Sequence, residues 1–166
     1  MKHLIILRHA KSNWSDLSLS DHDRPLNQRG KNAAPIMGKR LSMKPIQPQI
    51  VLCSTAARAQ ATANKVLAQI SQKYEIQFLK SLYHAYPDNI LDIISKISDN
   101  YQNIMIVGHN PGLTELANDL MDEYHFPNIP TAGLVTYELN ISHWNDITSM
   151  SSPAKLLDYD YPKKTL

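Results

Sequence analysis

Short apolar runs without polar alternation recur along the chain, and polar or turn-forming residues separate them. The clearest runs are residues 3–8, 50–53 and 104–107. Unbroken apolar runs of this length are typical of strands that are buried on both faces of a parallel sheet. Residues 74–79 alternate enough to predict a further strand.

Between these runs, apolar residues recur at helical spacing and predict helices. The helices are expected from Asn27 to about residue 43, from Ser54-Thr55 to about Ile70, from Pro87 to about Ile97 and from Gly112 to about Tyr124. Asn27 is a good N-cap for the first of them. Pro35 lies inside that helix and is expected to kink it or to move its start.

The C-terminal part of the chain shows a different pattern. Residues 133–140 and 143–150 predict two strands, and Asn140-Ile141-Ser142 between them would suit an antiparallel hairpin. The last dozen residues are expected to be irregular.

Strands that alternate with helices predict an α/β fold with right-handed crossovers. We expect a three-layer sandwich, in which helices flank a mostly parallel central sheet, with an antiparallel strand near the C-terminus. A length of 166 residues suits a single domain over residues 1–166. Ligands of such sheets bind beyond the carboxyl ends of the strands, and this edge is where chemistry is expected.

Composition excludes several classes of protein. Apolar residues make up 43% of the chain and charged residues 19%, which excludes a disordered, collagenous or coiled-coil chain. Cys53 is the only cysteine, so an internal disulfide is impossible and a reducing compartment is favoured. The net charge of +2 without a dense basic stripe argues against a nucleic-acid partner. The apolar runs are too short for a membrane span or a signal peptide, and we expect a cytoplasmic protein.

Two arginines and two histidines fall at corresponding ends of the predicted strands. Arg8-His9 ends the first strand, Arg58 follows the second, and His109 follows the fourth. Arginine binds phosphate oxygens with a planar fork, and a neutral imidazole is a nucleophile toward phosphorus near pH 7. A second, protonated imidazole could donate to the phosphoryl oxygens. The set indicates phosphoryl transfer, and position alone leaves open which histidine attacks.

Four motifs in order resemble the histidine phosphatase superfamily, and most closely its small bacterial branch of phosphohistidine phosphatases. They are Leu7-Arg8-His9-Ala10-Lys11-Ser12, Asp23-Arg24-Pro25-Leu26 with Arg29-Gly30, Ser54 to Ala63 with Arg58 and Thr62, and Val107-Gly108-His109-Asn110-Pro111. The resemblance implies a phosphoglycerate mutase-like fold. It also implies that His9 is the nucleophile that becomes phosphohistidine, and that Arg8, Arg58 and His109 clamp the phosphoryl group. Ser15 is a further phosphate-binding candidate, with an ordinary loop serine as the alternative.

The sequence departs from the family pattern at two places. Ala10 stands where the family usually has glycine, so its φ should be below zero or its backbone strained. Larger members place a carboxylate shortly after the third strand as proton donor, whereas here His84 and Asp88 are the nearest candidates. Asp88 could instead cap a helix. The helical insertion that closes over small substrates is also missing, which implies a shallow site.

The leading hypothesis is a metal-independent phosphatase that acts on phosphohistidine in a partner protein. No cofactor is expected, and Asp21-His22-Asp23 offers too few oxygen ligands for a metal loop. One alternative is a phosphatase of small phosphorylated metabolites. The other is a catalytically inactive module that binds phosphorylated partners, although binding alone does not need His9.

Overall fold

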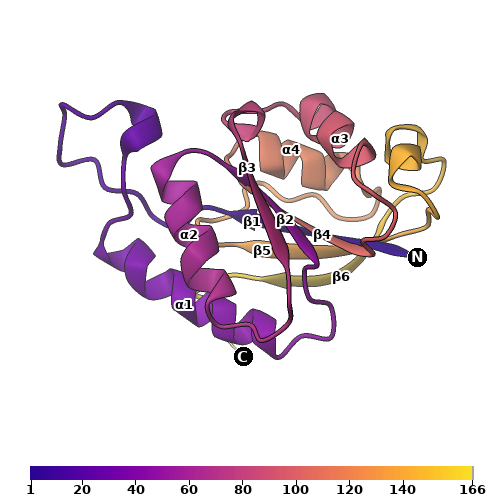
Figure 1. Cartoon of the computed structure of the whole chain (residues 1–166), viewed down its shortest axis with the longest axis horizontal. Helices are drawn as coiled ribbons and strands as arrows, with labels where there is room; N and C mark the ends of the chain where they lie inside the picture. The colour runs from indigo at the N-terminus through magenta and orange to yellow at the C-terminus, as the bar shows by residue number, and fades with distance from the viewer. Residues whose placement is uncertain (166) are drawn as a thin grey trace.

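A single sheet forms the centre of the molecule, and helices cover both of its faces (Figure 1). The computed structural model describes residues 1–165. The strands are β1 (Lys2–Arg8), β2 (Ile50–Ser54), β3 (Glu75–Leu79), β4 (Asn103–Gly108), β5 (Leu134–Leu139) and β6 (Lys155–Asp160). Their order across the sheet is β3-β2-β4-β1-β5-β6.

Strand direction divides the sheet into two parts. Strands β3, β2, β4 and β1 are parallel to one another, whereas β5 is antiparallel to both β1 and β6. The α/β class, the mostly parallel sheet and the antiparallel end near the C-terminus are therefore confirmed.

The helices form the two outer layers (Figure 1). Helices α1 (Gln28–Ser42) and α2 (Ala57–Leu67) cover one face, and α3 (Pro87–Ser95) and α4 (Gly112–Asp119) cover the other. Along β1, Leu4 and Ile6 enter the core under α3 and α4, while Ile5 and Leu7 enter the core under α1 and α2. Because both faces are covered, every position of the strand interior has to be apolar. None of the helices within residues 1–165 is long and apolar enough to cross a membrane.

Helix ends follow local side-chain chemistry where the sequence offers it. Asn27 is the N-cap of α1, and its side chain accepts a 2.9 Å hydrogen bond from the Gly30 N–H. Pro35 lies inside α1 and does not move its start. Helix α2 begins later than expected, because Ser54 accepts from the Ala56 N–H instead of capping the first turn. Helix α4 ends at Asp119, five residues before the expected Tyr124.

The expected strand at 143–150 is wrong, because Trp144–Ser149 forms a short 3-10 helix, η3. Trp144 and Ile147 lie one 3-10 turn apart and both are buried. The Trp144 indole donates to the Tyr101 carbonyl at 2.7 Å, which fixes this turn beside the sheet.

The expectation of an irregular C-terminal segment is also wrong. Residues Lys155–Asp160 form β6, which pairs with β5 across a longer connection than the expected hairpin. Asp160 is almost fully buried and accepts a 2.9 Å hydrogen bond from Arg40 of α1. This long-range ion pair holds the last strand against α1.

Candidate active site

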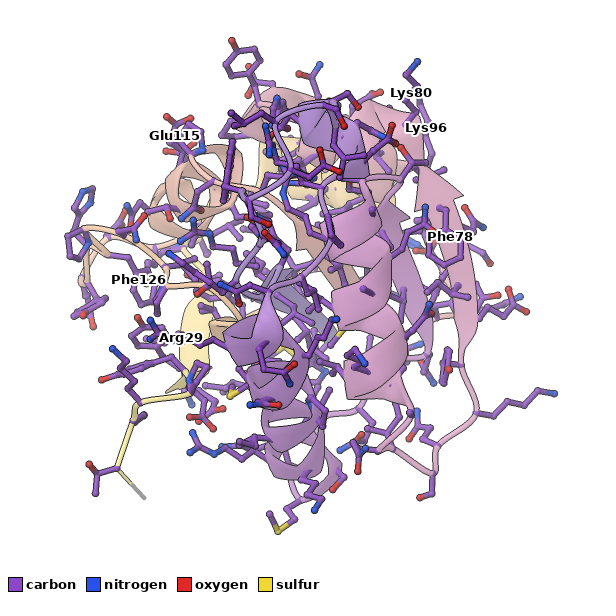
Figure 2. All side chains as sticks on the ribbon, turned by 90° about the vertical axis from the view of Figure 1, so that its left-hand side faces the viewer. Arg29, Phe78, Lys80, Lys96, Glu115 and Phe126 are labelled. Atoms are coloured by element: carbon purple, nitrogen blue, oxygen red, sulfur yellow. The ribbon has the colours of Figure 1, made fainter. Side chains whose placement is uncertain are left out.

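Three neighbouring strands bring the candidate residues to one edge of the sheet. Strands β2, β4 and β1 are adjacent and parallel, so their carboxyl ends lie on the same side of the sheet. Ser54 and Arg8 are the last residues of β2 and β1, and His109 and His9 directly follow β4 and β1. Figure 2 looks onto this end of the molecule. Arg58 joins the set from the first turn of α2.

The two histidines and Arg58 form a compact and largely buried cluster. The rings of His9 and His109 lie 5.2 Å apart, measured between their centroids. His9 is 7% exposed, and Arg58 and His109 are each 4% exposed. Arg8 borders the same cluster, and one of its terminal nitrogens donates to the Ile129 carbonyl at 2.8 Å. The sequence-derived set of four therefore meets at one place.

The hydrogen bond of His9 determines which of its nitrogens is free to react. His9 Nδ1 lies 2.7 Å from the Ala10 carbonyl oxygen, which can only accept, so Nδ1 carries the proton. The lone pair is then on Nε2. Burial lowers the pKa of His9 to about 4; the bond to Ala10 opposes this shift, and the charges of Arg58 and Arg8 add to it. His9 is therefore neutral and nucleophilic at neutral pH.

Ala10 supports this geometry without strain in its own backbone. Among residues 1–165, the non-glycine residues with a positive φ are His84 and Ala132. The φ of Ala10 is therefore negative, as expected for an unstrained alanine in place of glycine. The Ala10 N–H donates to the Thr62 hydroxyl of α2 at 2.9 Å. This bond anchors the turn after β1 to the helix that carries Arg58.

His109 is held in a different environment. Its Nε2 lies 2.7 Å from the Ser54 hydroxyl, while its Nδ1 is buried without a hydrogen-bond partner among the described residues. Burial, with the charges of His9, Arg58 and His84, lowers the pKa of His109 to about 3. The expected protonated second imidazole is thus not the state of the free site. A phosphoryl dianion beside the ring would favour protonation.

Asp21 is the residue of this cluster that the sequence did not single out as a site residue. Arg58 donates to the Asp21 carbonyl at 2.6 Å and to its carboxylate at 3.0 Å. The Tyr83 hydroxyl donates to the same carboxylate, and His84 Nε2 lies 3.4 Å from it. Burial would raise the pKa of Asp21, but the bonds from Tyr83 and Arg58 outweigh burial and lower it. Asp21 is therefore an ionised partner of Arg58.

The comparisons with known proteins agree with this arrangement. Residues 4–83 match the model of the histidine phosphatase superfamily (branch 1). An uncharacterized protein of Mycobacterium tuberculosis is 33% identical over 150 residues, which cover 85% of this chain and 91% of that protein.

The chain belongs to the histidine phosphatase superfamily.

Further similarities indicate which members of the superfamily this chain resembles. A structure assigned as the phosphohistidine phosphatase SixA of Agrobacterium tumefaciens superposes with a TM-score of 0.82 and 26% identity, over 97% of this chain and 99% of that one. This histidine phosphatase thus falls with the SixA-like members, and its neighbours support a phosphatase activity. A chloroplastic protein of Arabidopsis thaliana is 38% identical over 128 residues, 72% of this chain, and the match spans only 59% of that relative's length.

The two proton-donor candidates of this histidine phosphatase lie in different places. His84 is part of the site: its ring stacks on Tyr83 at 4.1 Å and meets His109 edge-on at 5.4 Å. Its φ of 53° lies in the left-handed region, which is uncommon for residues other than glycine. A Cβ at Gly112 would overlap the Ala85 carbonyl, so only glycine lets this loop lie against the start of α4.

Among residues 1–165, no hydrogen bond or ion pair links Asp88 or Ser15 to the residues around His9. Asp88 is exposed in the first turn of α3, whose N-cap is Tyr86, so the expected capping role is wrong. The Ser15 hydroxyl donates to the Asn13 side chain at 2.7 Å within an exposed part of the loop after β1.

We expect the ring signals of His9 to titrate with a midpoint near pH 4 in an NMR experiment. The ordinary midpoint of histidine is about 6.5. The folded state therefore binds this proton less readily than the unfolded chain does. As a result, the contribution of His9 to folding stability falls as the pH drops from about 6.5 to about 4. Arg58→Ala removes a positive neighbour and should raise the midpoint. A wild-type midpoint above about 6 would contradict the buried, neutral state of His9.

Proposed function

We propose that this protein is a metal-independent phosphatase that forms a phosphohistidine intermediate on His9. The observation that carries the proposal is the bond from His9 Nδ1 to the Ala10 carbonyl, which leaves the Nε2 lone pair available. In the first step, Nε2 attacks phosphorus, the new P–N bond forms, and the bond to the leaving group breaks. In the second step, water attacks the phosphohistidine, and phosphate leaves with His9 neutral again.

The charge of the transferring phosphoryl group is stabilised by the residues around His9. Arg8 and Arg58 offer planar donors that stay charged at any physiological pH. His109 Nδ1, which is buried and unpartnered among the described residues, is a further group able to contact a phosphoryl oxygen. Preorganised donors of this kind each contribute about 10²–10³ in rate.

Phosphohistidine in a partner protein is the substrate that suits this site best. An alkoxide leaving group needs a proton from an acid, whereas the imidazole of phosphohistidine is far less basic. Asp21 is the carboxylate bonded to Arg58, and its lowered pKa keeps it ionised, so it has no proton to give. Only α2 and short loops lie between β2 and β3, so no large insertion covers the site from that side. A side chain displayed on another protein could therefore approach this edge.

A phosphatase of small metabolites is the second candidate, and the position of His84 favours it. His84 is exposed, lies edge-on to His109 and contacts the Asp21 carboxylate. A protonated His84 would be an acid for alcohol leaving groups, which metabolite phosphates require.

A turnover panel separates the candidates. The purified protein is assayed on phosphohistidine-bearing peptide, phosphoramidate, nitrophenyl phosphate and sugar phosphates, each with and without EDTA. We expect turnover of the first three, unchanged by EDTA and inhibited by vanadate, which adopts a five-coordinate geometry. Loss of activity in EDTA that a divalent ion restores would contradict metal independence. Preference for a sugar phosphate would favour the metabolite phosphatase.

A further inference from the structure

A basic groove lies beside the candidate active site, and the mechanism above does not use it. Its volume is about 550 Å³, and it is bounded by the start of α1, the segment before β5 and the chain that follows β6. Its polar side chains include Lys11, Arg29 and Lys163. Figure 2 shows Arg29 at the end of the molecule that carries the carboxyl ends of β1, β2 and β4.

The three cations of the groove are not neutralised by neighbouring acids. Among residues 1–165, the lysines and arginines that form ion pairs are Lys2, Arg40, Lys44, Arg58 and Lys96. The described lining of the groove contains no aspartate or glutamate, and all three of its cations are exposed. Cations gathered in a concavity repel one another and focus a positive potential that attracts an anionic partner.

The fold holds this groove close to His9. Lys11 follows His9 by two residues, which is at most about 7 Å of extended chain. A Cβ at Gly30 would overlap the Lys11 carbonyl, so only glycine lets α1 begin here and place Arg29 beside Lys11. On the other wall, Thr131 precedes Ala132, whose N–H donates to the Arg8 and His9 carbonyls at 3.1 Å.

We propose that this groove docks an acidic segment of the protein that carries the phosphohistidine, next to the residue to be dephosphorylated. The inference rests on the proposed function. Exposed cations suit carboxylates on a mobile or surface segment, because such contacts steer association and orient the partner without deep burial. Tyr161 and Pro162 add apolar surface between the cations, against which the backbone of the segment can pack.

The test uses synthetic phosphohistidine peptides of equal length that carry Glu-rich, Gln-rich or Lys-rich flanks. The variant is the double charge reversal Arg29→Glu with Lys163→Glu, which leaves Lys11 and the catalytic set untouched. The matched control is a second double charge reversal outside the groove, Lys73→Glu with Lys80→Glu. Both control positions are exposed and flank β3, at the opposite edge of the sheet from β6.

Wild type should prefer the Glu-rich peptide over the Gln-rich one in kcat/KM, by about tenfold at low salt, and high salt should remove the preference. The groove variant should lose the preference while it hydrolyses phosphoramidate as fast as wild type. The control variant should keep the preference. Equal turnover of all three peptides by wild type, or equal loss in both variants, would overturn the proposed docking site.

Binding of the unphosphorylated Glu-rich peptide, followed by fluorescence anisotropy, separates this inference from the proposed function. If wild type hydrolyses no phosphohistidine peptide, the proposed function fails. Salt-sensitive binding of the Glu-rich peptide to wild type, but not to the groove variant, would still show that the groove binds an acidic ligand. If phosphohistidine is hydrolysed but the Glu-rich peptide binds no better than the Gln-rich one, only the groove proposal fails. A groove that binds a short oligonucleotide in preference to the Glu-rich peptide would likewise contradict a protein partner.

Discussion

His9→Ala is expected to lower kcat/KM by about four orders of magnitude or more, because the variant lacks the atom that accepts the phosphoryl group. The remaining donors could still bind phosphate, so vanadate should bind the variant even though turnover is lost. The measurement is kcat/KM on phosphoramidate and on nitrophenyl phosphate, with vanadate binding measured in parallel. Retained vanadate binding would show that the pocket is still folded.

His125→Ala is the matched control, since His125 is exposed and lies outside the cluster around His9. It should leave both rates unchanged. If His9→Ala kept more than a few per cent of wild-type activity, His9 would not be the nucleophile. An inactive His109→Ala beside an active His9→Ala would reverse the roles of the two histidines.

The second large effect concerns leaving groups. We expect kcat/KM to fall by orders of magnitude from nitrophenyl phosphate to simple alkyl phosphates. An alkoxide leaving group needs a proton, and Asp21, the carboxylate bonded to Arg58, is ionised and cannot donate one. The measurement is a series of phosphate esters whose leaving groups differ in pKa, plotted as the logarithm of kcat/KM. A steep negative slope is the expected result.

His84→Ala tests the remaining source of a proton in the same series. It should hardly change the rate with nitrophenyl phosphate, whose leaving group departs without protonation. A shallow slope in wild type that becomes steep in His84→Ala would make His84 the general acid. The metabolite phosphatase would then be the better reading of the site.

The ends of the buried strands could be predicted because a buried strand is an unbroken apolar run, which is visible in the sequence. A strand covered on both faces has to be apolar throughout, so β1, β2 and β4 stand out, and the polar residues that follow them mark the edge of the sheet. The sequence alone therefore predicts that Arg8, His9 and His109 lie at the same edge of the sheet. Arg58 could be placed at the same edge because it lies in the first turn of α2, the helix that comes after β2.

Asp21 escaped prediction because its partners are distant in the chain. Asp21 begins a three-residue 3-10 helix, 37 residues before Arg58 and 62 residues before Tyr83. A polar loop gives no periodicity from which such a contact could be read. The left-handed backbone of His84 was equally hidden, because it depends on how its loop lies against Gly112.

The expected strand at 133–140 is confirmed as β5, but the position of the strand that follows it was misread for a different reason. Trp144 and Ile147 are apolar residues in a short segment, and such a run fits a strand or a tight helical turn equally well. The segment that does form β6 carries Asp158 and Asp160, which lowered its strand character. It pairs with β5, and the ion pair of Asp160 with Arg40 links it to α1; both contacts are long-range, and no local pattern reveals them.

Trapping the phosphorylated enzyme tests the central claim most directly. Wild-type protein is mixed with ³²P-labelled phosphoramidate, quenched in base and digested, and the labelled peptide is sequenced by mass spectrometry. The expected result is one acid-labile, base-stable phosphate on His9, which is absent from His9→Ala. A stable label on His109 or on a hydroxyl side chain, or turnover without any label in a quench fast enough to catch the intermediate, would contradict a phosphohistidine intermediate on His9.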